Sequence, residues 1–295
     1  GGTLAYWSTS KNGAVYITYM NTDGSIKSTV TIDKDTANGS GSSATNGYGT
    51  EVESLGDLDG DGVVDIAVGS EAEESEKGVI YIHYLNANGS VKSTVKINDA
   101  TTNGPDLTNG DNYGSDIANM GDLDGDGVID IAVGADEDSS VGTDRGAVYI
   151  HYMNANGSIK STVKINDNTS NGPVLSNSLK YGNSVENIGD LDGDGVNDMA
   201  VGAPTNNNQK GMVHIHYMNA NGSIKSTVPV DGTTLPDDST WNSWCTCYIM
   251  FGTAIVNIGD QDNDGVDDMA VGASMFGYGA DRDGNSGLDT RMNKG

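Results

Sequence analysis

The sequence predicts an all-β protein built from one four-stranded unit that recurs along the chain. Two stretches carry this prediction, because each occurs four times and the two alternate: one is rich in aspartate and the other resembles a hairpin. Composition agrees with it, since 42 glycines, abundant Asn, Ser and Thr and only five prolines suit many tight turns and disfavour long helices. The 295 residues suffice for one large all-β domain or two smaller ones.

The aspartate-rich stretch has the pattern D-x-D-x-D-G-x-x-D followed by a short apolar run. Its first aspartates lie 65, 68 and 70 residues apart. Such regular spacing indicates a repeat architecture. The four copies are GDLDGDGVVDIAVGS (56–70), GDLDGDGVIDIAVGA (121–135), GDLDGDGVNDMAVGA (189–203) and GDQDNDGVDDMAVGA (259–273).

The second stretch consists of two β-rich runs around Asn-Gly or Asp-Gly, the strongest short signal for a hairpin. The four copies are GAVYITYMNTDGSIKSTVTI (13–32), GVIYIHYLNANGSVKSTVKI (78–97), GAVYIHYMNANGSIKSTVKI (146–165) and GMVHIHYMNANGSIKSTVPV (211–230).

One period therefore offers four strands: one before the aspartate stretch, one after it and two in the hairpin. Four short antiparallel strands at fixed spacing are typical of a β-propeller blade, and the apolar IAVG run suits a second strand buried between neighbouring blades. We predict one propeller domain over residues 1–295, with complete blades at about 48–98, 113–166 and 181–230 and a C-terminal tail at 274–295.

Each end of the chain holds half a unit. The hairpin at 13–32 has no aspartate stretch of its own, and the last aspartate stretch has no hairpin. Residues 248–273 paired with 13–32 would complete a fourth blade, and a ring closed in this way has no loose edge strands. A surplus strand candidate, TLAYWS (3–8), competes with 268–273 for the second-strand place. This leaves open that the N-terminal strands complete the blade of a neighbouring molecule.

The spacing of the aspartates indicates a metal site. It places side-chain oxygens at positions 1, 3, 5 and 9 and a backbone carbonyl at position 7, and the glycine at position 6 permits the sharp turn. Hard oxygen ligands in this number suit Ca²⁺ better than Mg²⁺, whereas soft metals would require Cys or His, and none is near. An EF-hand would need Glu at position 12, where every copy has valine: Val68, Val133, Val201 and Val271.

We therefore predict about four Ca²⁺ ions, one in each aspartate loop. The fourth copy changes only non-ligand positions, to Gln261 and Asn263. The alternative is an acidic solvated turn, which four copies with identical ligand positions argue against. The role is predicted to be structural, since no nucleophile or general base recurs beside the loops. The predicted ligands are Asp57, Asp59, Asp61, Val63, Asp65; Asp122, Asp124, Asp126, Val128, Asp130; Asp190, Asp192, Asp194, Val196, Asp198; and Asp260, Asp262, Asp264, Val266, Asp268.

These repeats resemble the FG-GAP repeats of integrin α-subunit propellers and of many secreted bacterial proteins. The name-giving pairs occur as Phe251-Gly252 and Gly202-Ala203-Pro204, and the remaining repeats begin with Tyr-Gly at Tyr48, Tyr113 and Tyr181. The resemblance covers nearly the whole chain, although familiar members have about seven blades. It implies an extracellular or cell-surface, calcium-stabilised propeller used for adhesion and recognition.

Two other residue types recur with the hairpin. His83, His151 and His216 occupy one position, which is Thr18 in the first copy, and this recurrence indicates packing or a cross-strand pair instead of catalysis. Four lysines recur in the second strand of the hairpin and are expected to be solvated charges that discourage edge pairing: Lys27, Lys92, Lys160 and Lys225.

The segment STWNSWCTCYIMFG (239–252) interrupts the repeat. Its aromatic residues form either an apolar seal at the ring closure or a contact surface for a partner or glycan. Cys245 and Cys247 are either a C-x-C disulfide or free thiols. The residues of the predicted contact surface are Trp7, Trp241, Trp244 and Phe276.

Charge and motifs restrict the function. A formal charge of -27 disfavours binding to nucleic acid, and no apolar run approaches the length of a membrane span. No catalytic constellation is evident, so we expect no enzyme activity. The predicted function is an extracellular structural protein that assembles with itself into a filament or surface array, or serves adhesion. The alternatives are a module that binds a glycan or another surface protein and, less favoured, the non-catalytic part of a secreted polysaccharide-active enzyme.

Overall fold

The computed structural model describes residues 13–41, 47–205, 210–232, 247–248, 250–274 and 276–277. Its strands form three four-stranded antiparallel sheets and three strand pairs. The first sheet contains β3 (Tyr48–Gly56), β4 (Asp65–Ser70), β5 (Val79–Leu85) and β6 (Val91–Ile97). The second contains β7 (Tyr113–Gly121), β8 (Asp130–Ala135), β9 (Ala147–Met153) and β10 (Ile159–Ile165). The third contains β11 (Ser184–Asn187), β12 (Met199–Ala203), β13 (Met212–Met218) and β14 (Ile224–Asp231).

The strand pairs lie at the ends of the repeat array. The N-terminal hairpin is β1 (Val15–Met20) with β2 (Ile26–Ile32), and the C-terminal strand pair is β16 (Phe251–Gly259) with β17 (Asp268–Ala273). A third pair joins β15 (Cys247–Tyr248) to β18 (Phe276–Gly277). The helix assigned in the described part of the chain, α1 (Glu73–Glu76), is a single turn, and no helix there is long and apolar enough to cross a membrane.

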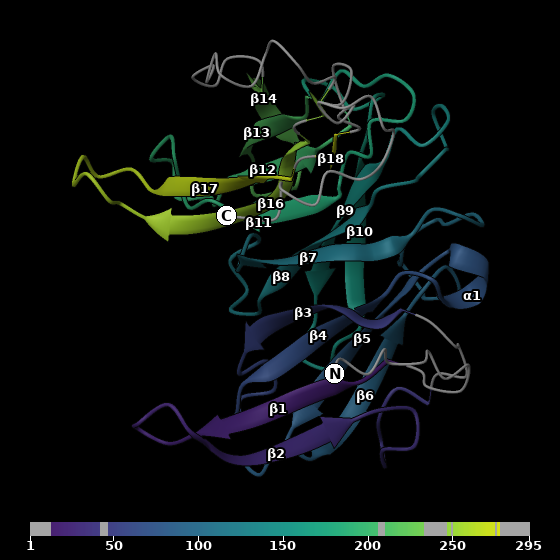
Figure 1. Cartoon of the computed structure of the whole chain (residues 1–295), viewed down its shortest axis with the longest axis vertical. Helices are drawn as coiled ribbons and strands as arrows, with labels where there is room; N and C mark the ends of the chain where they lie inside the picture. The colour runs from purple at the N-terminus through teal and green to yellow at the C-terminus, as the bar shows by residue number, and fades with distance from the viewer. Residues whose placement is uncertain are drawn as a thin grey trace, which may run out of the picture.

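Within each complete sheet the strands follow chain order, so the predicted four-strand repeat is confirmed as a meander. The sheets also follow chain order along the molecule, from the N-terminal hairpin at one end to the C-terminal strand pair toward the other (Figure 1). Each apolar core lies between consecutive members of this series. One cluster, for example, joins Ile80 and Ile82 of the first sheet to Tyr113, Ile131 and Tyr149 of the second. Because a single sheet cannot bury both of its faces, each repeat depends on its neighbours.

A close backbone contact joins each sheet to the next and explains a glycine of the repeat. Gly78 bridges Tyr113, Gly146 bridges Tyr181 and Gly211 bridges Phe251. A Cβ atom on Gly78 would lie 2.0 Å from the carbonyl oxygen of Tyr113, far inside van der Waals contact. The glycine before the hairpin is therefore required by the distance between neighbouring sheets.

The predicted closing pair is not formed within the described residues. The N-terminal hairpin and the C-terminal strand pair are separate two-stranded sheets, and they lie far apart in Figure 1. Ring closure and the number of blades therefore stay predictions. The strand candidate at 3–8 and most of the tail at 274–295 lie outside the described residues.

The recurring histidines are buried structural residues, as predicted. In the second sheet, the Nε2 atom of His151 lies 2.7 Å from the hydroxyl oxygen of Tyr113, and its Nδ1 atom lies 2.7 Å from Oγ1 of Thr162. The Thr162 hydroxyl donates to the carbonyl oxygen of Asn103, so it must accept from Nδ1–H of the histidine. Nε2 is then the acceptor for the tyrosine hydroxyl, and the neutral imidazole has a partner at each nitrogen. Burial lowers the pKa of His151 to about 3, which agrees with this assignment.

The same hydrogen-bonded row of Tyr, His and Thr side chains occurs in each complete sheet. The Tyr···His distances are 2.8 Å in the first sheet and 2.7 Å in the third, and the His···Thr distances are 2.7 and 2.8 Å. The residues are Tyr48, His83 and Thr94 in the first sheet and Tyr181, His216 and Thr227 in the third.

Prediction from the Tyr–His–Thr hydrogen bonds: Tyr113→Phe leaves Nε2 of His151 buried without a donor. The variant should therefore lower the free energy of unfolding by about 1–3 kcal/mol. His151→Thr should then cost less in the Tyr113→Phe background than in the wild type, because no orphaned group remains. Urea denaturation of the two single variants and the double variant measures this coupling. Costs that add to within about 0.5 kcal/mol would show that the pair is not coupled.

Candidate functional site

Each aspartate loop connects the first strand of a unit to the second, and its carboxylates order the loop through backbone N–H groups. In the first loop, Oδ1 of Asp57 accepts from Asp61 N at 2.9 Å, and Oδ2 accepts from Gly62 N at 2.8 Å. Oδ1 of Asp61 accepts from Val63 N at 2.9 Å. The loops beginning at Asp122, Asp190 and Asp260 repeat these three contacts. The predicted turn is therefore held by position 1, whose carboxylate faces the interior of the loop.

The ninth residue of each loop joins it to the sheet. Asp65, Asp130 and Asp198 are buried, with at most 1% of their surface exposed. One carboxylate oxygen of Asp130 accepts from Leu123 N in the loop, and the other accepts from Met153 N at the end of the third strand. Burial raises the pKa of Asp130 to about 6. In the fourth loop, Asp268 keeps the contact within the loop, with Gln261 N at 2.9 Å.

Three carboxylates gather in every loop. In each group the candidate ligand oxygens all lie within 4.8 Å of one another. Oxygens bound to one Ca²⁺ at about 2.4 Å can be at most about 4.8 Å apart, so these groups could share an ion without a change of fold. The groups are Asp57, Asp59 and Asp61; Asp122, Asp124 and Asp130; Asp190, Asp192 and Asp194; and Asp260, Asp262 and Asp268.

The donor set of these groups fits a hard cation. The atoms that converge are carboxylate oxygens, and neither His nor Cys joins any group among the described residues. The remaining predicted ligands are the carboxylates of Asp65, Asp126, Asp198 and Asp264 and the carbonyl groups of Val63, Val128, Val196 and Val266. These ligands stay predictions.

A lysine from the fourth strand approaches each of the first three loops. Lys92 Nζ lies 2.7 Å from an oxygen of Asp59 and 2.7 Å from an oxygen of Asp61. Lys160 contacts Asp124 and Asp126, and Lys225 contacts Asp192 and Asp194. These three lysines lie partly exposed on the outer strands, as expected, and each also pairs with two carboxylates of its loop. Their recurrence at one position relative to the aspartate loop was the signal that could have revealed the pairing.

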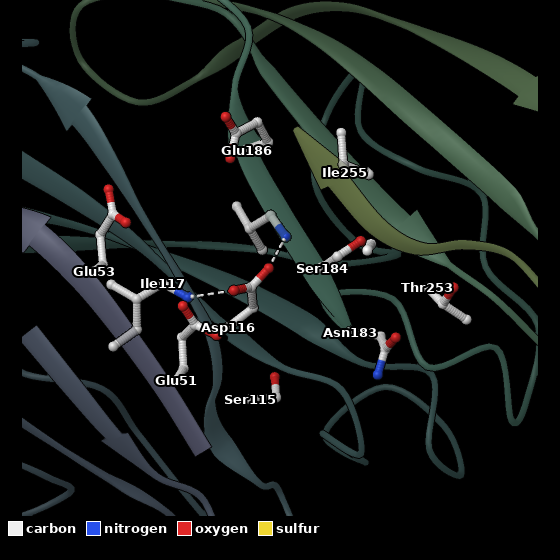
Figure 2. A pocket seen from close by; sticks show the side chains of 12 residues that line it. Glu51, Glu53, Ser115, Asp116, Ile117, Asn183, Ser184, Glu186, Thr253 and Ile255 are labelled. Atoms are coloured by element: carbon white, nitrogen blue, oxygen red, sulfur yellow. Dashed lines mark hydrogen bonds between the residues drawn. The ribbon is translucent and has the colours of Figure 1, made fainter. Parts of the chain in front are cut away.

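A second group of acidic residues lies on the first strands of the units, away from the aspartate loops. A hollow of about 350 Å³ is lined by β3, β7, β16 and the chain at the start of β11 (Figure 2). Four carboxylates line it: Glu51, Glu53, Asp116 and Glu186. No motif in the sequence pointed to this group of carboxylates. These residues come from three repeats, so their proximity was not visible in any one motif.

Two carboxylates of the hollow, those of Asp116 and Glu186, accept hydrogen bonds from backbone N–H groups of the next sheet. Asp116 accepts from Val185 N at 2.6 Å and from Ile117 N at 3.0 Å (Figure 2), and Glu186 accepts from Asn257 N at 3.0 Å. Burial raises the pKa of Asp116 to about 7 and also raises the pKa of Glu51, Glu53 and Glu186. Asp116 and Glu186 therefore each connect the first strand of their own unit to the first strand of the next unit.

The predicted aromatic contact surface is only partly within the described residues. Trp7, Trp241, Trp244 and Cys245 lie outside them. Phe276 belongs to β18, and Cys247 belongs to β15, which pairs with it. The contact surface and the disulfide stay predictions.

Prediction from the acidic hollow: Asp116→Asn should change how stability depends on pH. The folded protein holds a proton on Asp116 up to about pH 7, whereas the unfolded chain loses it near pH 4, so this group lowers stability as pH rises from about 4 to 7. The variant should therefore gain roughly 2–4 kcal/mol over the wild type between pH 4 and pH 8. Urea denaturation across this range measures the change, with the exposed Asp35→Asn as a control. An equal pH dependence in all three proteins would contradict it.

Comparison with known proteins places these repeats in a family. The model of the FG-GAP repeat matches residues 181–216, and that of the FG-GAP-like repeat matches residues 57–133. Integrin alpha-4 of Xenopus laevis is 33% identical over 150 residues, which is 50% of this chain and 13% of the relative. Integrin alpha-11 of Homo sapiens is 33% identical over 166 residues, 56% of this chain and 13% of the relative. Integrin alpha-6 of Homo sapiens is 34% identical over 166 residues, 55% of this chain and 12% of the relative.

The chain spans about an eighth of the length of these relatives. The chain carries FG-GAP and FG-GAP-like repeats at residues 181–216 and 57–133 and is similar, over about half its length, to integrin α-subunits.

Proposed function

We propose that the chain is a calcium-stabilised β-propeller module of an extracellular or cell-surface protein, with a structural or adhesive role. The observation that carries this proposal is the fourfold occurrence of one loop, in which three carboxylates converge at equivalent places between strands. A bound Ca²⁺ would neutralise carboxylates that otherwise repel one another, at roughly 4 kcal/mol for each close pair at an effective dielectric of 20.

The position of the loops supports a structural role for the metal. The predicted side-chain ligands of each site belong to a single loop, and in the three complete sheets the ninth aspartate binds the last N–H of the third strand. Ordering the loop therefore orders the sheet. A lysine partly balances the negative charge of each of the first three loops, so each of these loops already attracts one cationic group.

Closure is the second part of the proposal. The N-terminal hairpin and the C-terminal strand pair are complementary halves of one unit, so their pairing would give every unit four strands, as in a four-bladed ring. If the halves belong to different molecules, the same pairing would link the chains into a filament or a surface array.

The names of the relatives favour adhesion to proteins as the use of such a module. The alternative is a glycan- or protein-binding module, which the predicted aromatic surface at Trp7, Trp241, Trp244 and Phe276 favours. The non-catalytic part of a secreted polysaccharide-active enzyme is less favoured.

Prediction on calcium removal: EDTA should lower the melting temperature, and millimolar Ca²⁺ should restore it. A ligand that binds only the native state stabilises it by about 2.7 kcal/mol per site at a hundredfold excess over Kd. Differential scanning calorimetry with EDTA, Ca²⁺ or Mg²⁺ measures this, and Mg²⁺ should have the smaller effect. Identical melting in EDTA and Ca²⁺ would exclude a stabilising calcium site.

Prediction on the loops: Asp124→Asn and Asp192→Asn should each abolish one of about four calcium sites, and the double variant should abolish two. The matched control is Asp267→Asn, which makes the same chemical change in an aspartate loop at a position that is not a predicted ligand. Isothermal titration calorimetry gives the number of sites in each variant. A control that loses a site, or ligand variants that keep all sites, would refute the predicted ligand set.

A further inference from the structure

One histidine of the third sheet is buried without a hydrogen-bond partner. His214 of β13 is 2% exposed, and neither of its ring nitrogens has a partner within the part of the chain that the structure describes. The recurring histidine two residues further along this strand, His216, has a partner at each nitrogen. Because an unpaired polar group in a protein interior is costly, the exception at His214 requires an explanation.

The second sheet shows what fills this position in another repeat. There the residue is Tyr149, which pairs with the second strand in the same register as His214. Its hydroxyl oxygen lies 2.9 Å from the carbonyl oxygen of Asp106 and 3.1 Å from Oδ2 of Asp138. Lys164, which pairs with Tyr149 across the hairpin, contacts the same carboxylate. The phenol, carboxylate and ammonium groups therefore satisfy one another.

The first sheet has the same arrangement. The hydroxyl oxygen of Tyr81 lies 2.8 Å from both carboxylate oxygens of Glu73, and Lys96 Nζ lies 3.1 Å from one of them. In two of the three complete sheets, a phenol ring and a lysine side chain thus fill this place together.

The third sheet keeps the inner part of this arrangement and lacks the outer part. The His214 ring is stacked on His216 at 6.1 Å and meets Tyr181 edge to face at 5.5 Å, and the ring of Tyr149 makes the same two kinds of contact. An imidazole ring is shorter than a phenol ring with its hydroxyl group, however, and Pro229 replaces the lysine. The atoms that would reach outward from this position are therefore missing.

A hollow of about 350 Å³ lies beside the imidazole. It is lined by Gly172, Val174, Met212, His214, Thr227 and Pro229. Val174 is 87% exposed, so the hollow opens to solvent. The Thr227 hydroxyl is already used, because it donates to the carbonyl oxygen of Asn171 at 2.6 Å and contacts His216. The imidazole is therefore the lining side chain that is left to form a hydrogen bond with a ligand.

We propose that this hollow binds a small neutral molecule of the phenol class, whose ring packs against the apolar lining and whose hydroxyl group donates to a ring nitrogen of His214. The choice of a phenol follows from Tyr81 and Tyr149, which place a ring with a hydroxyl group at this position of the repeat. Burial lowers the pKa of His214 to about 4, so at neutral pH the imidazole is uncharged and one of its nitrogens can accept a hydrogen bond.

Charge and position set this hollow apart from the aspartate loops. A charged ligand is disfavoured, because no lining side chain carries a charge that would pair with it. The hollow lies near the start of β13, whereas the aspartate loop is tied to the end of that strand at Met218 N. Binding of a phenol is therefore independent of calcium.

The test uses 4-methylphenol, which has the structure of a tyrosine side chain, and the whole chain labelled with ¹³C at its four histidines. The NMR signal of the His214 imidazole, identified by its absence in His214→Phe, should shift on titration, whereas those of the other three histidines should shift little. Toluene lacks the hydroxyl group and should bind at least about tenfold more weakly. Equal affinity for the two ligands, or a titration that leaves the His214 signal unchanged, overturns the proposal.

Two variants locate the ligand. His214→Tyr introduces the residue of the first and second sheets, so it should fold, fill the hollow with its own ring and bind 4-methylphenol at least about tenfold more weakly. Val228→Ala is the matched control, because Val228 lies between Thr227 and Pro229 on β14 and its side chain points to the opposite face. Wild-type affinity in His214→Tyr, or loss of binding in the control, overturns the proposal. The comparison with toluene uses the wild-type chain and decides the question even if His214→Tyr does not fold.

Discussion

The buried aspartate that begins each second strand is the interaction on which the rest of the unit depends. Its two oxygens accept from the acidic loop on one side and from the end of the third strand on the other, as Asp130 does with Leu123 N and Met153 N. A change in the loop is therefore transmitted to the hairpin through one carboxylate. This geometry explains why a metal loop between strands can influence the stability of a whole sheet. In the C-terminal strand pair, Asp268 keeps the contact within its loop, with Gln261 N.

Much of the fold could be predicted because its determinants are local and repeated. The Asn-Gly turns predicted the hairpins, and the regular recurrence of the aspartate loops predicted one four-stranded sheet for each complete repeat. The turn at each loop was predictable for the same reason, since Asp57 binds N–H groups only four and five residues away. Recurrence also identified His151 as structural, although its partners Tyr113 and Thr162 required the structure.

The features that could not be predicted depend on distances between repeats. The hollow at Asp116 gathers carboxylates from three units, and its hydrogen bond to Val185 N spans 69 residues. Lys160 reaches its loop across a whole hairpin, so spacing alone did not distinguish an ion pair from a free charge. Burial then acts on these groups as it does elsewhere in proteins, by raising the pKa of acids that are removed from water.

The hydrogen bond between tyrosine and histidine has a further consequence for the fidelity of folding. The four hairpins are so alike in sequence that each could pair with the second strand of another unit while the chain is still partly unfolded, and such exchange is a characteristic failure of repeat proteins. A hairpin that carries histidine, placed against β16 and β17, would bury an imidazole nitrogen opposite Phe251 with no donor. The hairpin that carries Thr18, placed against Tyr113 or Tyr181, would leave a tyrosine hydroxyl without its acceptor. Because a wrong pairing leaves a buried polar group unsatisfied, this one hydrogen bond favours the correct partner among hairpins that are nearly identical in sequence.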